Sequence, residues 1–145
     1  MDKKEFIQRL RANRIIKGNR PTYIYLRKNV GNIYRGKRSD FILSINKNEL
    51  YFQKITFFKG LKPKDDFILN IKDFIHFKII TYNILFSSLC LYDKDRNFIE
   101  INYDTRRKDS YETEVNMNDI VKRLVDAGIT ELVYESEDQN EESND

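Results

Sequence analysis

The sequence is poor in the residues that build most catalytic and metal centres: its 145 residues include one cysteine, one histidine and no tryptophan. Cys90 cannot form an internal disulfide, and its position in an apolar run predicts a buried, reduced thiol, as is usual in cytoplasmic proteins. One cysteine and one histidine cannot supply the four protein ligands of a structural zinc site. A Ser–His–Asp or Cys–His centre would need His76, and no spacing in the chain places a nucleophile beside it.

Long hydrophobic runs and glycine-rich motifs are also missing. The longest uncharged run, residues 79–92, is too short to cross a bilayer as a helix. The N-terminus is charged and has no apolar core of the kind that secretory signals carry, which favours a cytoplasmic location. The five glycines are scattered and form no phosphate-binding loop. We therefore predict a protein without metal or other cofactors, and we expect binding and not catalysis.

Asp93, Asp95 and Asn97 have the spacing that begins a calcium-binding EF-hand loop. Phe98 stands where that loop needs glycine, and the segment lies between two predicted strands instead of two helices. We therefore predict a solvated hairpin turn here.

Charge is distributed unevenly along the chain, although the net charge is only +3. Residues 1–38 contain 12 Lys and Arg against 2 acids, or +10; residues 39–108 contain 12 against 9, or +3; residues 109–145 contain 2 against 12, or −10. One reading is a basic surface for an anionic partner such as nucleic acid, acidic lipid or an acidic protein. The other is that both ends only keep the domain soluble.

The ends of the chain differ from its middle. Residues 1–19 are predicted to form a basic amphipathic helix, in which Phe6, Ile7 and Leu10 share one face. Residues 20–134 are predicted to form the folded body, and Pro21 favours extended backbone at Arg20. Residues 135–145 are acidic and nearly devoid of apolar residues, which predicts a disordered tail.

Alternating apolar residues predict a series of antiparallel strands in the body. These strands are expected at residues 22–26, 41–46, 50–58, 67–71, 75–79, 84–92 and 98–103. The clearest hairpin turns at Asn46-Lys47-Asn48, and a bend is expected at Lys72-Asp73. The first strand could expose an edge at Thr22–Leu26 that pairs two chains into a homo-oligomer.

One helix closes the predicted body, at residues 117–127. Asn116 or Asn118 is expected to cap it, and Met117, Ile120 and Leu124 lie on its apolar stripe. Gly128 is expected to end it in a left-handed conformation, with Ile129 folding back. The predicted fold is therefore mainly β with α (α+β): a strand meander in a partly open barrel or roll, closed by a C-terminal helix and preceded by the N-terminal basic helix.

Basic and aromatic residues are concentrated at and after the first strand. In an extended strand Tyr23 and Tyr25 point to one face, and Ile24 and Leu26 to the other. Arginine and lysine bind phosphates, and exposed tyrosine stacks on bases or lies at a membrane interface. The candidate ligand-binding residues are Tyr23, Tyr25, Arg27, Lys28, Arg35, Lys37 and Arg38. Alternatively, the tyrosines are half-buried core residues and the cations are ordinary surface charges.

Five segments together resemble a bacterial pleckstrin-homology-like (PH-like or GRAM-like) domain. They are Leu43–Phe52, Leu69–Phe77, Leu85–Leu91, Ile99–Tyr103 and Ile120–Ile129, about the last two thirds of the predicted ordered chain. The resemblance implies a seven-stranded, partly open barrel capped by a C-terminal helix. It also implies a non-enzymatic module that binds peptides, proteins or anionic lipids.

Three functions follow as hypotheses. The first is a PH-like adaptor that engages a protein partner or an anionic lipid headgroup through the basic surface. The second is a nucleic-acid-associated regulatory protein that uses the basic N-terminal region, and the third is a small enzyme of unrecognised type. The sequence favours the first because the strand order and the basic loop ending at Arg38 both fit it.

Overall fold

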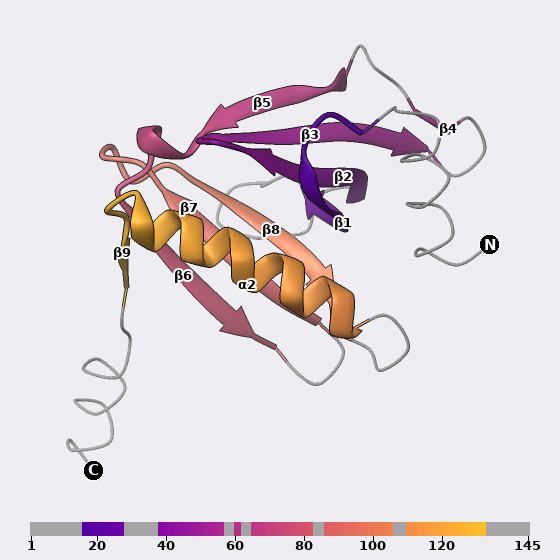
Figure 1. Cartoon of the computed structure of the whole chain (residues 1–145). Helices are drawn as coiled ribbons and strands as arrows, with labels where there is room; N and C mark the ends of the chain where they lie inside the picture. Colours follow the sequence, from indigo (N-terminus) through magenta and orange to yellow (C-terminus); the bar gives the residue numbers. More distant parts are fainter. Residues whose placement is uncertain are drawn as a thin grey trace.

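The computed structural model describes most of the body of the chain, namely residues 16–27, 38–56, 60–61, 65–82, 86–105 and 110–132. These residues form a mainly β domain with one C-terminal helix, α2 (Ser110–Asp126) (Figure 1). The strands are β1 (Asn19–Arg27), β2 (Arg38–Asn46), β3 (Glu49–Thr56), β4 (Gly60–Leu61), β5 (Phe67–Asn70), β6 (His76–Thr81), β7 (Phe86–Tyr92), β8 (Phe98–Asp104) and β9 (Thr130–Glu131). Within the described ranges, no helix has the length and apolarity needed to span a membrane.

All nine strands belong to one sheet, in the order β4-β3-β2-β1-β8-β7-β6-β9, and β5 also pairs with β3. Every pairing is antiparallel except that of β6 with β9. The sheet is thus two antiparallel meanders, one from β1 to β3 and one from β6 to β8, joined where β1 meets β8. The predicted α+β class and strand meander are confirmed at this level.

The two meanders meet at a narrow junction. Only Tyr25 and Asn102 are paired between β1 and β8. The Asn102 side-chain amide donates to the Tyr25 carbonyl at 3.2 Å, and its Oδ1 accepts from Ser88 Oγ at 2.5 Å. A buried side chain therefore supplements the backbone ladder at the point where the ladder is shortest.

The core lies between the inner face of the curved sheet and α2, which crosses that face (Figure 1). Strand residues facing inward, such as Ile24, Leu43 and Ile101, pack together with Met117, Ile120 and Leu124 of the helix. Phe52 stacks on Phe67 with ring centroids 4.5 Å apart, and Phe41 meets both rings edge-on. Alternation along the strands thus buries one set of side chains against the helix, as period-2 patterns require.

The predicted start of the helix was wrong. The helix begins at Ser110, so Asn116 and Asn118 lie inside it and do not cap it. The Asn116 amide instead donates to the Pro21 carbonyl at 3.1 Å, a tertiary contact that ties the helix to β1. The predicted end was right: Gly128 has φ +91°, and the Ile129 N–H donates to the Leu124 carbonyl at 3.0 Å.

The β2–β3 turn and the bend after β5 agree with the sequence predictions, whereas the backbone at Arg20 does not. Lys47 turns the β2–β3 hairpin with φ +55°, and a short 3₁₀ helix, Ile71–Asp73, makes the predicted bend. Arg20 is not extended: its φ is +57°, within an irregular start of β1, and its Nε lies 2.6 Å from Asp119 Oδ2 on α2. This departure from the preference that Pro21 imposes coincides with the register shift at the start of β1.

Two further expectations concern the first strand and the chain ends. β1 lies inside the sheet order, because it pairs with β2 along most of its length and with β8 at Tyr25, so Thr22–Leu26 is not the end strand that was predicted. Pairing of two chains there stays a prediction. The predicted N-terminal helix falls almost entirely on residues 1–15, and the predicted tail on residues 135–145. Both lie outside the described residues.

Candidate anion-binding site

Four of the seven candidate ligand-binding residues lie within the described ranges, and the structure brings them together. Tyr23, Tyr25 and Arg27 alternate along β1, and Arg38 begins β2 as the register partner of Arg27. All four lie on the outer face of the sheet, because Ile24 points into the core and Leu26 packs against it. Lys28, Arg35 and Lys37 lie outside the described residues.

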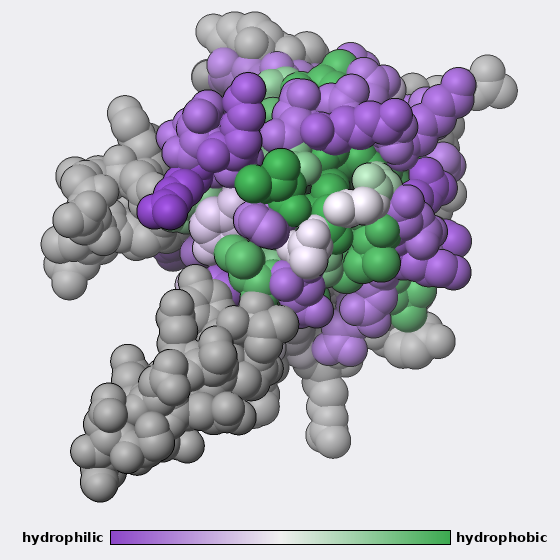
Figure 2. Space-filling view, turned by 90° about the vertical axis from the view of Figure 1, so that its left-hand side faces the viewer, coloured by the Kyte–Doolittle hydropathy of each residue, from purple (hydrophilic) through white to green (hydrophobic). Residues whose placement is uncertain are grey.

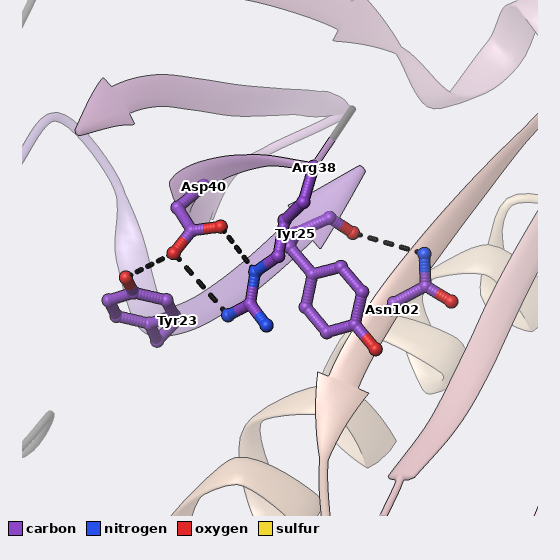
Figure 3. Close-up of polar contacts among 5 residues, drawn as sticks. All are labelled: Tyr23, Tyr25, Arg38, Asp40 and Asn102. Atoms are coloured by element: carbon purple, nitrogen blue, oxygen red, sulfur yellow. Dashed lines mark hydrogen bonds and ion pairs between the residues drawn. The ribbon is translucent and has the colours of Figure 1, made fainter. Parts of the chain in front are cut away.

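Asp40 organises this group, although the sequence did not single it out. Arg38 Nε donates to Asp40 Oδ1 at 2.7 Å, and Arg38 Nη2 lies 3.4 Å from Oδ2 (Figure 3). The Tyr23 hydroxyl donates to Oδ2 of the same carboxylate at 2.5 Å. Residues two apart on a strand share a face, so the Arg38–Asp40 spacing could have revealed the pair.

The guanidinium groups of Arg27 and Arg38 both lie over the Tyr25 ring. The Arg38 guanidinium lies 4.0 Å from the ring centroid, and that of Arg27 lies 5.6 Å from it. Tyr25 is only 8% exposed, so its ring is a fixed platform and not a free aromatic surface. Cation–π contact and the Asp40 carboxylate therefore hold Arg38 in one orientation.

The electrostatics of the cluster follow from this geometry. Burial, and then the hydrogen bond to Asp40, raises the pKa of the Tyr23 hydroxyl well above its ordinary value, so this group stays a proton donor. Burial alone would lower the pKa of Arg38, but the hydrogen bond and charge of Asp40 raise it overall. The cluster keeps a charged guanidinium whose Nε and Nη2 donate to the carboxylate.

A guanidinium has five N–H donors, and Asp40 uses two of them. The Arg38 side chain remains 41% exposed, and three of its N–H donors are not used by Asp40. These donors form a planar fork that matches the oxygens of a carboxylate or phosphate. The arrangement suits recognition of an anionic group.

The Cys90 thiol lies on the same outer face, in register with Glu100 of β8. Its Sγ is 3.6 Å from Glu100 Oε1. Burial, followed by the negative charge of Glu100, raises the pKa of Cys90 to about 12. A nucleophilic cysteine needs the opposite shift, and His76 pairs in register with Tyr92, not with Cys90. This environment does not support a Cys–His nucleophile.

The Cys90 thiol is expected to exchange slowly with disulfide reagents in the folded protein. At pH 8 its thiolate fraction is about a thousandfold below that of an ordinary cysteine, because its pKa is about 12. Ellman's reagent should therefore titrate the thiol rapidly only in denaturant. An introduced cysteine at exposed Lys122 serves as the reactive control. Equal rates for Cys90 in native and denatured protein would contradict the assigned environment.

The turn that begins like a calcium loop is a hairpin turn, as predicted. Asp93 Oδ1 accepts from the backbone N–H groups of Asp95 and Asn97, each at 2.9 Å. Across the residues that the structure describes, no group of three or more His, Cys, Asp or Glu side chains is arranged to hold a metal ion.

No family model matches the chain. No curated protein matches it either. Among solved structures, the chain is similar to the hSac2 domain from human phosphoinositide phosphatase Sac2, with a TM-score of 0.49 and 12% identity over 88% of this chain and 83% of that one. That degree of similarity is too low to carry an argument about fold family or function.

Proposed function

We propose that the protein is a non-enzymatic binding module of PH-like type that engages an anionic group through the site around Arg38. That group would be carried by a lipid headgroup or by an acidic protein partner. The observation that carries the proposal is the orientation of Arg38, which Asp40 and the Tyr25 ring hold while 41% of the Arg38 side chain stays exposed.

The strand order supports the PH-like part of the proposal. Two antiparallel meanders are joined through β1 and β8, and a C-terminal helix packs on the inner face of the sheet. The resemblance noted in the sequence implies a partly open barrel capped by such a helix. In this protein the sheet path ends at β4 and β9, which do not pair with each other, so it too is open.

Charge in the sequence supports the choice of an anionic ligand. Arg27 ends β1 and Arg38 begins β2, so the connection between them starts and finishes at the site. Its ten residues contain three cations, Lys28, Arg35 and Lys37, and no acid. Cations concentrated in this way attract anions over a distance of about 10 Å at moderate salt, and this attraction weakens as salt rises.

The two other functional hypotheses have less support. Nucleic-acid binding would use the basic N-terminal residues 1–19 together with the tyrosine-bearing strand β1, whose Tyr25 is only 8% exposed and so offers little ring surface for stacking on bases. An enzyme would need a reactive group, and the raised pKa of Cys90 opposes the most obvious one.

Replacing Arg38 by alanine is expected to weaken binding to anionic vesicles by about 10- to 100-fold, because a hydrogen-bonded ion pair contributes roughly 1.5 to 3 kcal/mol. Binding is measured by flotation with vesicles that contain an acidic phospholipid, at several salt concentrations. Lys122→Ala, which removes a cation from the exposed face of α2, is the matched control. Thermal unfolding of each variant confirms that the fold is intact.

The same variants are tested against an immobilised acidic peptide, which separates a protein ligand from a lipid one. If Arg38→Ala loses binding to only one of the two probes, and Lys122→Ala keeps binding to both, that probe identifies the ligand class. If wild-type protein bound neither the vesicles nor the peptide, or if both variants bound equally well, the proposed function would be wrong.

A further inference from the structure

Among the residues that the structure describes, one edge of the sheet is only partly covered. β9 pairs in parallel with β6 at His76 and Phe77 and then ends, while β6 continues to Thr81. On its other side β6 is paired with β7 along its whole length. Among the described residues, no strand pairs with the β9 side of β6 from Lys78 to Thr81.

The backbone groups on this edge can be identified. The carbonyls of Ile75 and Phe77 accept hydrogen bonds from Thr130 and Leu132, so odd-numbered residues of β6 face the edge. The N–H and C=O groups of a strand residue point to the same side, so Ile79 and Thr81 present the next donors and acceptors. These groups form a template for another strand.

Apolar side chains accompany the uncovered edge. Ile79 lies on the inner face of β6 yet is 38% exposed, because α2 packs mainly over β1. Ile75 and Val125 are also exposed, and both lie close to the Gly128 turn that leads into β9. Figure 2 shows hydrophobic residues gathered within a hydrophilic rim on the side where β9 and the end of α2 lie.

From these features we propose that the β6 edge pairs antiparallel with the same edge of a second copy of this chain. With the two-fold axis at Ile80, Ile79 of each copy faces Thr81 of the other, and these pairs exchange four backbone hydrogen bonds. The pairing makes one continuous sheet from two chains. It is independent of the anion-binding site.

The edge complements itself in this register. Residues 78–82 contain one charge, Lys78, and the register places it opposite Tyr82 of the other copy, so no like charges face each other. Ile80 meets Ile80 at the axis, and the exposed part of Ile79 gains cover. A two-fold interface requires such self-complementarity. The contact is short, so a weak, concentration-dependent dimer is expected.

Sedimentation equilibrium of the full chain from about 10 to 500 µM tests the proposal, since short interfaces dissociate in that range. Wild-type protein should show a monomer–dimer equilibrium, and Ile79→Lys should raise its dissociation constant at least tenfold. Val115→Lys, at a site on α2 that is 39% exposed, is a control of matched exposure. Ile68→Lys, on β5 at the other end of the sheet, tests the alternative edge.

A wild-type protein that stays monomeric throughout would overturn the proposal, and the β6 edge would then be covered by this chain's own following residues or serve another protein. Equal weakening by Ile68→Lys or Val115→Lys would also overturn it. The register has its own test: Ile80→Cys should give a covalent dimer on mild oxidation, and Lys122→Cys should not. Failure of Ile80→Cys to cross-link would exclude the two-fold axis at this residue.

Discussion

Replacing Phe52 by alanine is expected to lower the free energy of unfolding by about 3 to 5 kcal/mol, the usual cost of removing a large buried aromatic side chain. Phe52 is fully buried on β3, stacks on Phe67 and meets the edge of Phe41. These rings fill the core between β2, β3 and β5, so the substitution leaves a cavity bounded by three strands. The midpoint of thermal unfolding should fall by roughly 10 °C.

Urea unfolding followed by circular dichroism measures the effect. Phe98→Ala is the control, because Phe98 is 43% exposed at the start of β8 and its loss should cost less than about 1 kcal/mol. The slope of free energy against urea should stay the same for both variants. A cost for Phe52→Ala as small as that of Phe98→Ala would show that this aromatic cluster is not part of the core.

The second large effect is expected at Gly18, just before β1. A Cβ atom built on Gly18 would lie 2.9 Å from the backbone N and O of Ile45 and from Ser44 Oγ. The contacts with Ile45 cannot be relieved by a side-chain rotation, because its backbone is paired in the sheet. Gly18→Ala should therefore cost about 1 to 3 kcal/mol, as overpacking typically does.

A double-mutant cycle with Ser44 separates the two sources of this cost. Ser44 Oγ is buried and has no hydrogen-bond partner among the described residues, so Ser44→Ala alone should leave stability unchanged or raise it slightly. In the Ser44→Ala background, Gly18→Ala should cost less free energy than in the wild-type protein. The difference should equal only the part of the cost that the Ser44 hydroxyl causes. If Gly18→Ala cost nothing in the Ser44→Ala background, the Ile45 backbone would have moved away from the added methyl group, contrary to its place in β2.

The elements were predictable where a local pattern determines them. Alternation located the paired strands because a strand must bury every second residue, and Gly128 marked the end of the helix because its φ is positive. Residues 60–61, which lie outside the predicted strands, form the short strand β4. Strand order was beyond local patterns, since no feature near Tyr25 indicates that its partner is Asn102. The prediction of the helix start was wrong for the same reason: Asn116 contacts the distant Pro21 and does not cap the helix.

The candidate site was predicted in part. Placing Tyr23 and Tyr25 on one face needed only the geometry of a strand, and Ile24 confirms it by facing the core. The role of Asp40 depends on β2 lying beside β1, which brings one carboxylate within reach of both Tyr23 and Arg38. Strand pairing also decides that the Tyr25 ring is a buried platform for cations.

The narrow junction between β1 and β8 has a consequence for folding kinetics. Each meander can form from contacts that are near in sequence, whereas Tyr25 and Asn102 are 77 residues apart. Closing so long a loop carries a large entropic cost, and only one residue pair and the Asn102 amide compensate it directly at that point. The two meanders are therefore expected to acquire protection from hydrogen exchange before the junction does, with the joining of β1 to β8 as the slow step.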